Sequence, residues 1–513
     1  MNGAESLVRT LLACGVDTVF ANPGTSEMHF VSALDRVPGM KVVLATFEGV
    51  VAGAADGYAR MAGKPAATLL HCGPGLANGL ANFHNARRGH VPIVSIVGDQ
   101  ATYHKPLDPL LAADTIGFAS GVSTWVRTAH HPSQVGAYTA EAVQAATAPP
   151  GGVATLILPS DASWSEGGVV AEPLPPFPPA PAGEAAIAEA VNALRSGEPT
   201  IIILAGAALG RPGIDHAARV AAATGADLIA ETFNTRAAHG AGVPDVGRIP
   251  YPIDAALAAL APYRHTILVG ARDPVAFFAY PGKPGRQVPA QAKVHILAHP
   301  EDDGVDALAR LADALGAPAL VSQPAAQRPE PAQGAITPAA FAQSLAALLP
   351  KNAVVVDEAL TFGFPLYAAL AAAAPHDCLQ LTGGAIGDGL PMSTGAAIGA
   401  PGRRIVDVQA DGSALYTIQA LWTQAREKLD VTTVLLSNRR YEILFGELAG
   451  LGAQAGPASR DLFSLGRPDH DWVKLAAGFG VEGARAETME QFADLFISAN
   501  HRSGPFLIEL VIP

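Results

Sequence analysis

The sequence predicts an α/β protein made of three doubly wound, parallel-sheet domains. Short β-branched runs alternate with Ala-rich helical stretches along all 513 residues, and continuous apolar runs are typical of strands buried on both faces of a parallel sheet. Two Pro-rich segments, residues 171–183 and 322–338, can continue neither a helix nor a central strand, so we expect linkers there. They divide the chain into blocks of residues 1–170, 184–321 and 338–513.

Each block contains its own series of expected strands. In the first block they are residues 41–47, 65–71 and 91–98, with helices at 48–63 and 75–89 between them. The middle block provides 198–206, 225–232 and 265–271, and the last provides 352–358, 403–409, 430–437 and 505–513. Strands that alternate with helices imply parallel pairing through crossover connections.

Composition excludes several classes of protein. Hydrophobic residues make up 49% of the chain and charged residues 15%, which favours large buried cores over disorder. The net charge of −13, without a Lys/Arg run, argues against nucleic acid or an anionic membrane as a partner. The first residues lack a basic region followed by an apolar core, so we expect no signal peptide. Three cysteines without metal spacing fit a reducing, cytoplasmic setting.

A glycine-containing loop, "LAGAALGRPG", follows the first strand of the middle block. It is not a GxGxxG motif, and no acidic residue follows at the distance needed to bind a ribose. The pattern favours a tight turn into a helix, with nucleotide binding as the weaker alternative.

Two polar residues follow neighbouring apolar strands in the last block. Asp411 comes after "RRIVDVQ" and Asn438 after "VTTVLLS", and one expected helix, residues 413–427, connects the strands. A right-handed crossover places such strands close together, and ligands of parallel sheets bind at their carboxyl ends. Carboxylate and amide oxygens suit Mg²⁺. A diphosphate could complete the coordination, with Gly412 and Ser413 offering N–H groups at the helix N-terminus.

This stretch resembles the metal-binding motif of the thiamine-diphosphate (ThDP) enzymes, which begins Gly-Asp-Gly and ends in Asn-Asn. Here it begins Ala410-Asp411-Gly412 and ends Ser437-Asn438, so two positions depart from the pattern. The resemblance implies that Asp411, Asn438 and the backbone carbonyl of Arg440 hold Mg²⁺. Neither departure removes a metal ligand.

Glu48 opens the helix in "KVVLATFEGVVAGAADGYARMAG", which resembles the catalytic element of the same family. The resemblance implies that its carboxyl group contacts the aminopyrimidine of ThDP, favouring the imino tautomer that removes the C2 proton. Without the metal motif, Glu48 would pass for an acidic residue favoured by the helix dipole.

Residues 381–400, "LTGGAIGDGLPMSTGAAIGA", provide the third element of the resemblance. Ile386 matches the bulky residue that holds the cofactor in its bent shape. Gly383 and Gly384 would let the backbone approach the pyrimidine ring. Thr361 is a further candidate for contact with the diphosphate.

The three blocks match the family's pyrimidine-binding, middle and pyrophosphate-binding domains in order. The resemblance therefore implies active sites between subunits of a dimer, with a dimer of dimers (a homotetramer) as the expected assembly. Acetolactate synthases of this family also bind FAD in the middle domain, but no feature of this sequence demands FAD.

Within the family, the chain resembles benzoylformate decarboxylases most. "ANPGTSEMHF" puts Thr25 where the relative uses a serine against the substrate carboxylate. His71, in "TLLHCGPGLANG", matches a pocket histidine, although a histidine at a strand end can also serve structure alone. Asn78 matches an asparagine that contacts the cofactor.

The remaining pocket residues come from three segments. Leu110 and Leu111 match apolar pocket positions, and Ile443 and Leu444 would shape the same pocket. Tyr280 is the candidate for a second active-site histidine of the relative. A tyrosine titrates near ~10 and cannot relay protons at neutral pH as an imidazole can.

These resemblances imply a ThDP- and Mg²⁺-dependent enzyme acting on a 2-oxo acid. It would release CO₂ and form an aldehyde, or join the remaining fragment to a second carbonyl as an acyloin, with Thr25 and His71 orienting the carboxylate and moving protons. An acetolactate-synthase-like carboligase is the alternative within the family. A catalytically silent structural or regulatory homologue is the alternative of another class, because of Ala410 and Ser437.

Overall fold

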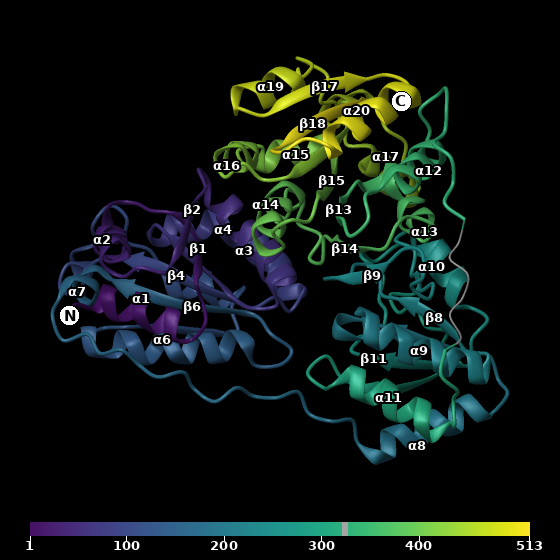
Figure 1. Cartoon of the computed structure of the whole chain (residues 1–513), viewed down its shortest axis with the longest axis horizontal. Coiled ribbons are helices and arrows are strands. Elements are labelled where there is room, and N and C mark those ends of the chain that lie inside the picture. The colour runs from purple at the N-terminus through teal and green to yellow at the C-terminus, as the bar shows by residue number, and fades with distance from the viewer. Residues whose placement is uncertain (321–326) are drawn as a thin grey trace.

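Three α/β units, each built on a mostly parallel sheet, make up the protein (Figure 1). The computed structural model describes residues 1–320 and 327–513. The end of the predicted middle block and the first part of the predicted linker 322–338 therefore lie outside the described residues. The predicted fold class is confirmed.

The N-terminal domain has a six-stranded parallel sheet in the order β2-β1-β3-β4-β6-β5. Its strands are β1 (Thr18–Asn22), β2 (Lys41–Leu44), β3 (Ala66–Leu70), β4 (Ile93–Asp99), β5 (Trp125–Thr128) and β6 (Val153–Pro159). Its helices are α1 (Gly3–Ala13), α2 (Met28–Arg36), α3 (Glu48–Ala62), α4 (Cys72–Arg88), α5 (Thr115–Ser120), α6 (Pro132–Thr147) and α7 (Ser160–Trp164), with the short η1 (Thr25–Glu27) and η2 (Lys105–Leu107).

The middle domain has a five-stranded parallel sheet in the order β10-β8-β7-β11-β12. These strands are β7 (Thr200–Leu204), β8 (Asp227–Ala230), β10 (Gly247–Arg248), β11 (His265–Val269) and β12 (Lys293–Ala298). The helices are α8 (Glu184–Arg195), α9 (Arg211–Thr224), α10 (Ile253–Leu260) and α11 (Gly304–Ala314), with η3 (Gly206–Leu209). The glycine-containing loop thus forms a short turn that leads into α9, as the favoured interpretation predicted.

The C-terminal domain has a seven-stranded sheet in the order β17-β18-β16-β15-β13-β14-β9. Its strands are β9 (Ala237–His239), β13 (Val354–Glu358), β14 (His376–Gln380), β15 (Ile405–Ala410), β16 (Val431–Ser437), β17 (Glu482–Ala486) and β18 (Phe506–Val511). The helices are α12 (Pro338–Leu348), α13 (Leu366–Leu370), α14 (Gly389–Gly399), α15 (Asp411–Thr417), α16 (Ala420–Arg426), α17 (Glu442–Gly450), α18 (Pro457–Leu462), α19 (Trp472–Gly478) and α20 (Met489–Asn500), with η4 (Leu360–Gly363).

One strand of this last sheet comes from the middle segment of the chain. β9 pairs antiparallel with β14, with His239 opposite His376, and Figure 1 shows it beside the C-terminal domain. The His239 ring stacks on Tyr367 with a centroid separation of 4.4 Å, and its Nε2 contacts the Tyr367 carbonyl. The pairing joins the middle segment to the C-terminal sheet through backbone and aromatic contacts.

The N- and C-terminal domains meet through α3 and α14. Glycines allow the two helices to pack backbone to backbone: a Cβ on Gly57 would collide with the Met392 carbonyl, and one on Gly395 with the Ala54 carbonyl. Their apolar residues belong to one core cluster that spans both domains. Glu48, the first residue of α3, therefore belongs to a helix that is packed closely against the C-terminal domain.

A buried ion pair adds the middle segment to this interface. Arg60 on α3 makes two hydrogen bonds to the Asp56 carboxylate, at 2.7 and 2.6 Å, and neither side chain is exposed. The same guanidinium donates to the Gln380 carbonyl (2.7 Å) and to the Thr235 carbonyl (3.2 Å). One side chain thus contacts all three units.

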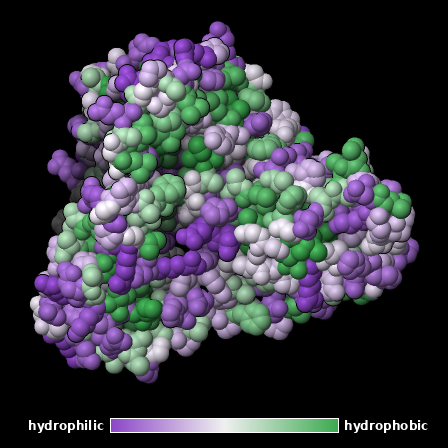
Figure 2. Space-filling model, turned by 180° about the vertical axis from the view of Figure 1, so that it is seen from behind, coloured by the Kyte–Doolittle hydropathy of each residue, from purple (hydrophilic) through white to green (hydrophobic). Residues whose placement is uncertain are grey.

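The surface carries both polar and apolar areas. Seen from behind, hydrophobic residues are visible over the C-terminal domain and near its junction with the N-terminal domain (Figure 2). No helix among the described residues is long and apolar enough to cross a bilayer.

His376 makes the stability of this fold sensitive to acid. Its Nε2 is buried without a hydrogen-bond partner, and burial, together with His239, lowers the pKa of His376 to about 4. The unfolded chain takes up the proton near pH ~6.5, so stability is present above that pH and is lost as pH falls toward 4, by an amount on the order of 3 kcal/mol.

We therefore expect His376→Asn, which keeps a donor for the Ala374 carbonyl, to lose less stability between pH 7 and 4 than the unmodified protein. The measurement is the thermal unfolding midpoint of both proteins across this range. Parallel pH curves would show that His376 contributes nothing to the acid sensitivity.

Candidate active site

The carboxyl end of the C-terminal sheet brings Asp411 and Asn438 together. β15 and β16 are adjacent and parallel, with Ala410 opposite Leu436, so each polar residue follows the same sheet edge. Asp411 is 4% exposed and accepts hydrogen bonds from the backbone N–H groups of Gly412 (2.8 Å) and Arg439 (2.6 Å). The crossover therefore produces the convergence that the spacing predicted.

The connection between these strands differs from the single helix expected over residues 413–427. It forms α15 and α16, which are separated by tighter i to i+3 hydrogen bonds such as Leu421 N–H to the Ile418 carbonyl. Thr417 at the end of α15 donates its hydroxyl to the Gly387 carbonyl at 2.8 Å. This long-range bond anchors the junction to the loop that precedes α14.

The two positions that depart from the family motif have backbone conformations open to any residue. Ala410 caps α15 with φ −75° and ψ 144°, and Ser437 is the last residue of β16. The unusual backbone lies at Arg439, whose φ of +59° is in the left-handed region. A backbone conformation that favours glycine thus occurs two residues after Ser437, at an arginine.

The donor set at this edge fits a hard divalent cation. Asp411 and Asn438 provide oxygen ligands, and Asn438 Oδ1 also accepts from the Arg440 N–H at 3.1 Å. Burial raises the pKa of Asp411, a cost that a bound cation would offset. Ser413 follows Gly412 in the first turn of α15, and its buried Oγ has no hydrogen-bond partner among the described residues.

Residues 381–387 form a loop that is held by the N-terminal domain. Asn85 on α4 donates to the Ala385 carbonyl (2.8 Å) and accepts from the Ala385 N–H (3.1 Å). His84 contacts the Gly383 carbonyl at 3.2 Å, and Gly384 has a φ of +75°. Ile386 is half-buried in this loop.

Glu358 supports the same loop from the C-terminal sheet. Its buried carboxylate accepts from the N–H groups of Gly387 (2.7 Å) and Gly389 (2.5 Å), and from Gln409 (3.1 Å). Asn82 on α4 donates to the carbonyls of Gly49 (2.8 Å) and Gly387 (3.4 Å). The loop is therefore tied to the residue that follows Glu48.

Glu48 lies 7% exposed at the start of α3 and accepts a hydrogen bond from Asn78 at 3.0 Å. Gly75 separates it from His71: a Cβ there would lie 3.0 Å from Glu48 Oε1 and 3.4 Å from the His71 Cβ. Glu48, His71 and Asn78 thus form one cluster around the N-terminus of α4.

Sequence reasoning missed Glu27, which is central to this cluster. Its carboxylate is 3% exposed and contacts His71 Nδ1 at 2.9 Å and the Ser26 hydroxyl at 2.5 Å. His71 Nδ1 can donate to this carboxylate, which leaves Nε2 free for another partner. Cys72 packs against Ser26, and burial raises the pKa of its thiol to about 11. The only available signal was the position of Glu27 two residues after Thr25, whose own side chain is exposed.

The other predicted pocket residues are scattered along the surface of a single chain. Leu110 is 99% exposed, and Leu111 beside it is half-buried. Ile443 and Leu444 lie on the first turn of α17, where Leu444 is 38% exposed.

Thr361 and Tyr280 lie near the same edge of the C-terminal domain. Thr361 is half-buried on η4. Tyr280 donates to Glu447 on α17 at 3.0 Å. It is Phe277, not Tyr280, whose ring lies against Gly384 of the 381–387 loop. The sequence could not distinguish the two aromatic residues, because both belong to the short irregular segment before β12.

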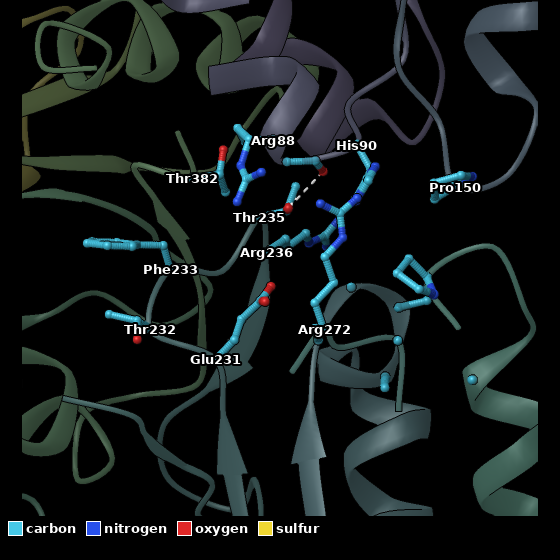
Figure 3. A pocket seen from close by; sticks show the side chains of 18 of the residues that line it. Arg88, His90, Pro150, Glu231, Thr232, Phe233, Thr235, Arg236, Arg272 and Thr382 are labelled. Carbon is cyan, nitrogen blue, oxygen red and sulfur yellow. Dashed lines mark hydrogen bonds between the residues drawn. The ribbon is translucent and has the colours of Figure 1, made fainter. Parts of the chain in front are cut away.

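A large cavity lies elsewhere, between the three domains. It measures about 1170 Å³ and shares only Gly383 with the predicted site residues. Figure 3 shows Arg88, Arg236 and Arg272 around it, with Glu231 directed toward the arginines. Burial raises the pKa of Glu231 to about 7 although two of these arginines oppose the shift. Because it contains neither Glu48 nor Asp411, this cavity is separate from the two clusters described above.

Known proteins resemble this chain throughout its length. Residues 1–118 match the family model described as "Thiamine pyrophosphate enzyme, N-terminal TPP binding domain", and residues 363–510 match its C-terminal counterpart. A Mycobacterium tuberculosis protein named "Putative acetolactate synthase large subunit IlvX" is 50% identical over 100% of this chain and 99% of its own length.

Two further comparisons extend the likeness. A benzoylformate decarboxylase from Pseudomonas aeruginosa is 27% identical over 97% of this chain and 96% of its own length. The structure of a thiamine-diphosphate-dependent 4-hydroxybenzoylformate decarboxylase from Rhodococcus jostii RHA1 superposes with a TM-score of 0.86, covering 100% of this chain and 99% of that one, at 24% identity. This last likeness concerns the fold.

Asn85 generates a prediction about the 381–387 loop. Asn85→Ala removes both hydrogen bonds to Ala385, each worth about 1 kcal/mol, so amide exchange in the loop should accelerate roughly tenfold or more. Hydrogen–deuterium exchange followed by mass spectrometry measures this. Asn192→Ala, at an exposed position of α8, serves as the control, and equal exchange in the two variants would contradict the role of Asn85.

Proposed function

The chain belongs to the thiamine-diphosphate-dependent enzymes, and from that premise we propose that it decarboxylates a 2-oxo acid with ThDP and Mg²⁺ as cofactors. The observation that carries the proposal is the pairing of a buried carboxylate, Asp411, with Asn438 at one sheet edge. This edge lies next to a loop that Asn82 ties to Gly49, the residue after Glu48. Asp411, Asn438 and the Arg440 carbonyl would hold the metal.

The cofactor, when bound, supplies an electron sink that accepts the electrons released with CO₂. Glu48, Gly383, Gly384 and Ile386 would contact its pyrimidine, and Gly412, Ser413 and Thr361 its diphosphate. Glu48 is 7% exposed, so it lies largely out of solvent at the start of α3, which suits a residue in contact with the cofactor. Asn78 orients that carboxyl group by its hydrogen bond.

His71 and Thr25 would act on the substrate. His71 Nδ1 faces Glu27 at 2.9 Å, so its other nitrogen can orient the substrate carboxylate or transfer a proton to the product. Glu27 positions the ring in this arrangement, as carboxylates commonly do for functional histidines. Thr25 is exposed and lies two residues before Glu27, and its hydroxyl can donate to the substrate carboxylate.

We further propose that two copies of the chain complete each active site. Among the described residues, no hydrogen bond joins the Glu48 cluster directly to Asp411 or Asn438. Large apolar side chains are exposed on both domains, including Leu110 at 99% and Leu107 at 73% on the N-terminal domain, and Phe364 at 43% on the C-terminal domain. Surfaces of this kind commonly mark interfaces. A dimer, or a dimer of dimers, would cover them.

A second candidate function is carboligation, in which the fragment left after CO₂ release joins a second carbonyl compound. The 50% identity to a protein named as a putative acetolactate synthase favours it. The two reactions share their steps up to the loss of CO₂, so the same residues would serve both.

Cofactor binding gives the first prediction. ThDP should bind saturably only with Mg²⁺ present, and Asp411→Asn should weaken that binding because it removes a charged ligand.

Glu48→Gln should retain bound ThDP but lose at least roughly 100-fold in turnover. Calorimetric titration and steady-state rates measure these, with the exposed surface variant Glu172→Gln as control. Absence of saturable binding would favour a silent homologue, and near-normal turnover of Glu48→Gln would refute its catalytic role.

Product analysis gives the second prediction. We expect CO₂ and an aldehyde from at least one member of a panel of aromatic, branched and short 2-oxo acids, without an added acceptor. Mass spectrometry and CO₂ release, each with and without aldehyde acceptors, distinguish the outcomes. If every productive substrate gave only acyloins, carboligation would be the function.

A further inference from the structure

Glu447 on α17 accepts hydrogen bonds from two tyrosines of the middle domain. Tyr251 donates to Glu447 Oε1 at 3.0 Å, and Tyr280 donates to Oε2 at 3.0 Å. All three side chains are half-buried. The contact joins the middle and C-terminal domains beside the metal-binding edge of the last sheet.

This group shares helix α17 with two residues of the proposed substrate pocket, Ile443 and Leu444. Glu447 follows Ile443 by four residues and Leu444 by three, so it shares a helix face with both. The N-terminal end of α17 follows Tyr441, whose ring lies against Gly412 of the diphosphate-binding turn. A carboxylate therefore occupies the helix face that carries the predicted apolar pocket residues.

Aromatic rings link the group to the cofactor loop. Tyr251 packs against Phe277 with a centroid separation of 5.4 Å and stacks on Phe364 at 6.3 Å. The Phe277 ring in turn lies against Gly384. These aromatic rings form a wall that runs from the 381–387 loop to the Glu447 carboxylate.

The hydrogen-bond arrangement leaves only acceptors at this end of the wall. Each tyrosine has one hydroxyl proton, and both protons are committed to Glu447. Burial and the Glu447 charge raise the pKa of both tyrosines, so the hydroxyls stay protonated. Within the part of the chain that the structure describes, Glu447 forms no ion pair with a lysine or arginine. Its carboxylate oxygens are hydrogen-bonded only to the two neutral tyrosine hydroxyl groups.

We propose that Glu447, Tyr251 and Tyr280 determine substrate specificity by selecting 2-oxo acids whose far end carries a cationic hydrogen-bond donor. The inference rests on the proposed 2-oxo acid site and names its substrate class. A cationic tail would donate N–H groups to the remaining lone pairs of Glu447 and the tyrosine oxygens. It would also bring the positive charge that the Glu447 carboxylate has no partner for. The neighbouring aromatic faces also favour a cation. A carboxylate-ended tail would be repelled and left without donors.

The test compares three straight-chain substrates that differ in the terminal group: 5-guanidino-2-oxopentanoate, 2-oxohexanoate and 2-oxohexanedioate. The ThDP- and Mg²⁺-loaded protein should show kcat/KM values roughly 10- to 100-fold higher for the guanidinium acid than for the methyl-ended one, with the dicarboxylate poorest. Glu447→Gln should bring the guanidinium and methyl-ended acids within a few-fold of each other, chiefly through KM. Tyr280→Phe should reduce the preference in part.

Glu482→Gln removes the same charge from an exposed position at the start of β17 and is the matched control, which should keep the full preference. Equal or reversed preference in the unmodified protein, or a preference that survives Glu447→Gln, would overturn the inference while 2-oxo acid turnover left the proposed function standing. If none of these acids, nor any of the aromatic and branched ones, were decarboxylated or ligated, the proposed function would fail and this inference with it.

Discussion

The buried Asp56–Arg60 pair is the constraint on which the arrangement of the three domains depends. Burying a guanidinium is costly unless its charge and its donors are satisfied. Here the Asp56 carboxylate neutralises it, and the remaining donors reach the carbonyls of Thr235 and Gln380 and the hydroxyl of Thr382. Because these acceptors belong to the middle segment and the C-terminal domain, the charge is fully solvated by protein only when all three units are in place.

The candidate active site inherits its rigidity from this arrangement. The 381–387 loop begins next to Gln380, whose carbonyl accepts a hydrogen bond from Arg60. Asn85 then holds the loop from the N-terminal domain and Glu358 holds it from the C-terminal domain, so the backbone expected against the cofactor is fixed from two domains. Gly387 connects this loop to the α15–α16 junction through Thr417. The sheet edge that carries Asp411 and Asn438 is thereby joined to the Glu48 helix through a short chain of hydrogen bonds.

Much of this could be predicted from the sequence where the signal is local. The convergence of Asp411 and Asn438 follows from parallel strands joined by one crossover, and the three-sheet architecture follows from the alternation of strands and helices. The division of the crossover into α15 and α16 could not be predicted, because the bond from Thr417 to Gly387 spans 30 residues of sequence. Glu27 escaped for the same reason: its contact with His71 lies 44 residues away. Nor does the short segment "AAH" carry any signal for a strand in a distant sheet.

That strand, β9, has a consequence for how the protein can be divided. By position in the chain, residues 237–239 belong to the middle unit, but their backbone pairs with β14. A fragment cut at the two Pro-rich segments would carry β9 away from the C-terminal sheet. The backbone N–H and C=O groups of β14 would then form an open edge, ready to pair with any passing extended chain. Modular exchange of the middle unit between relatives therefore risks aggregation unless the edge strand is supplied with it.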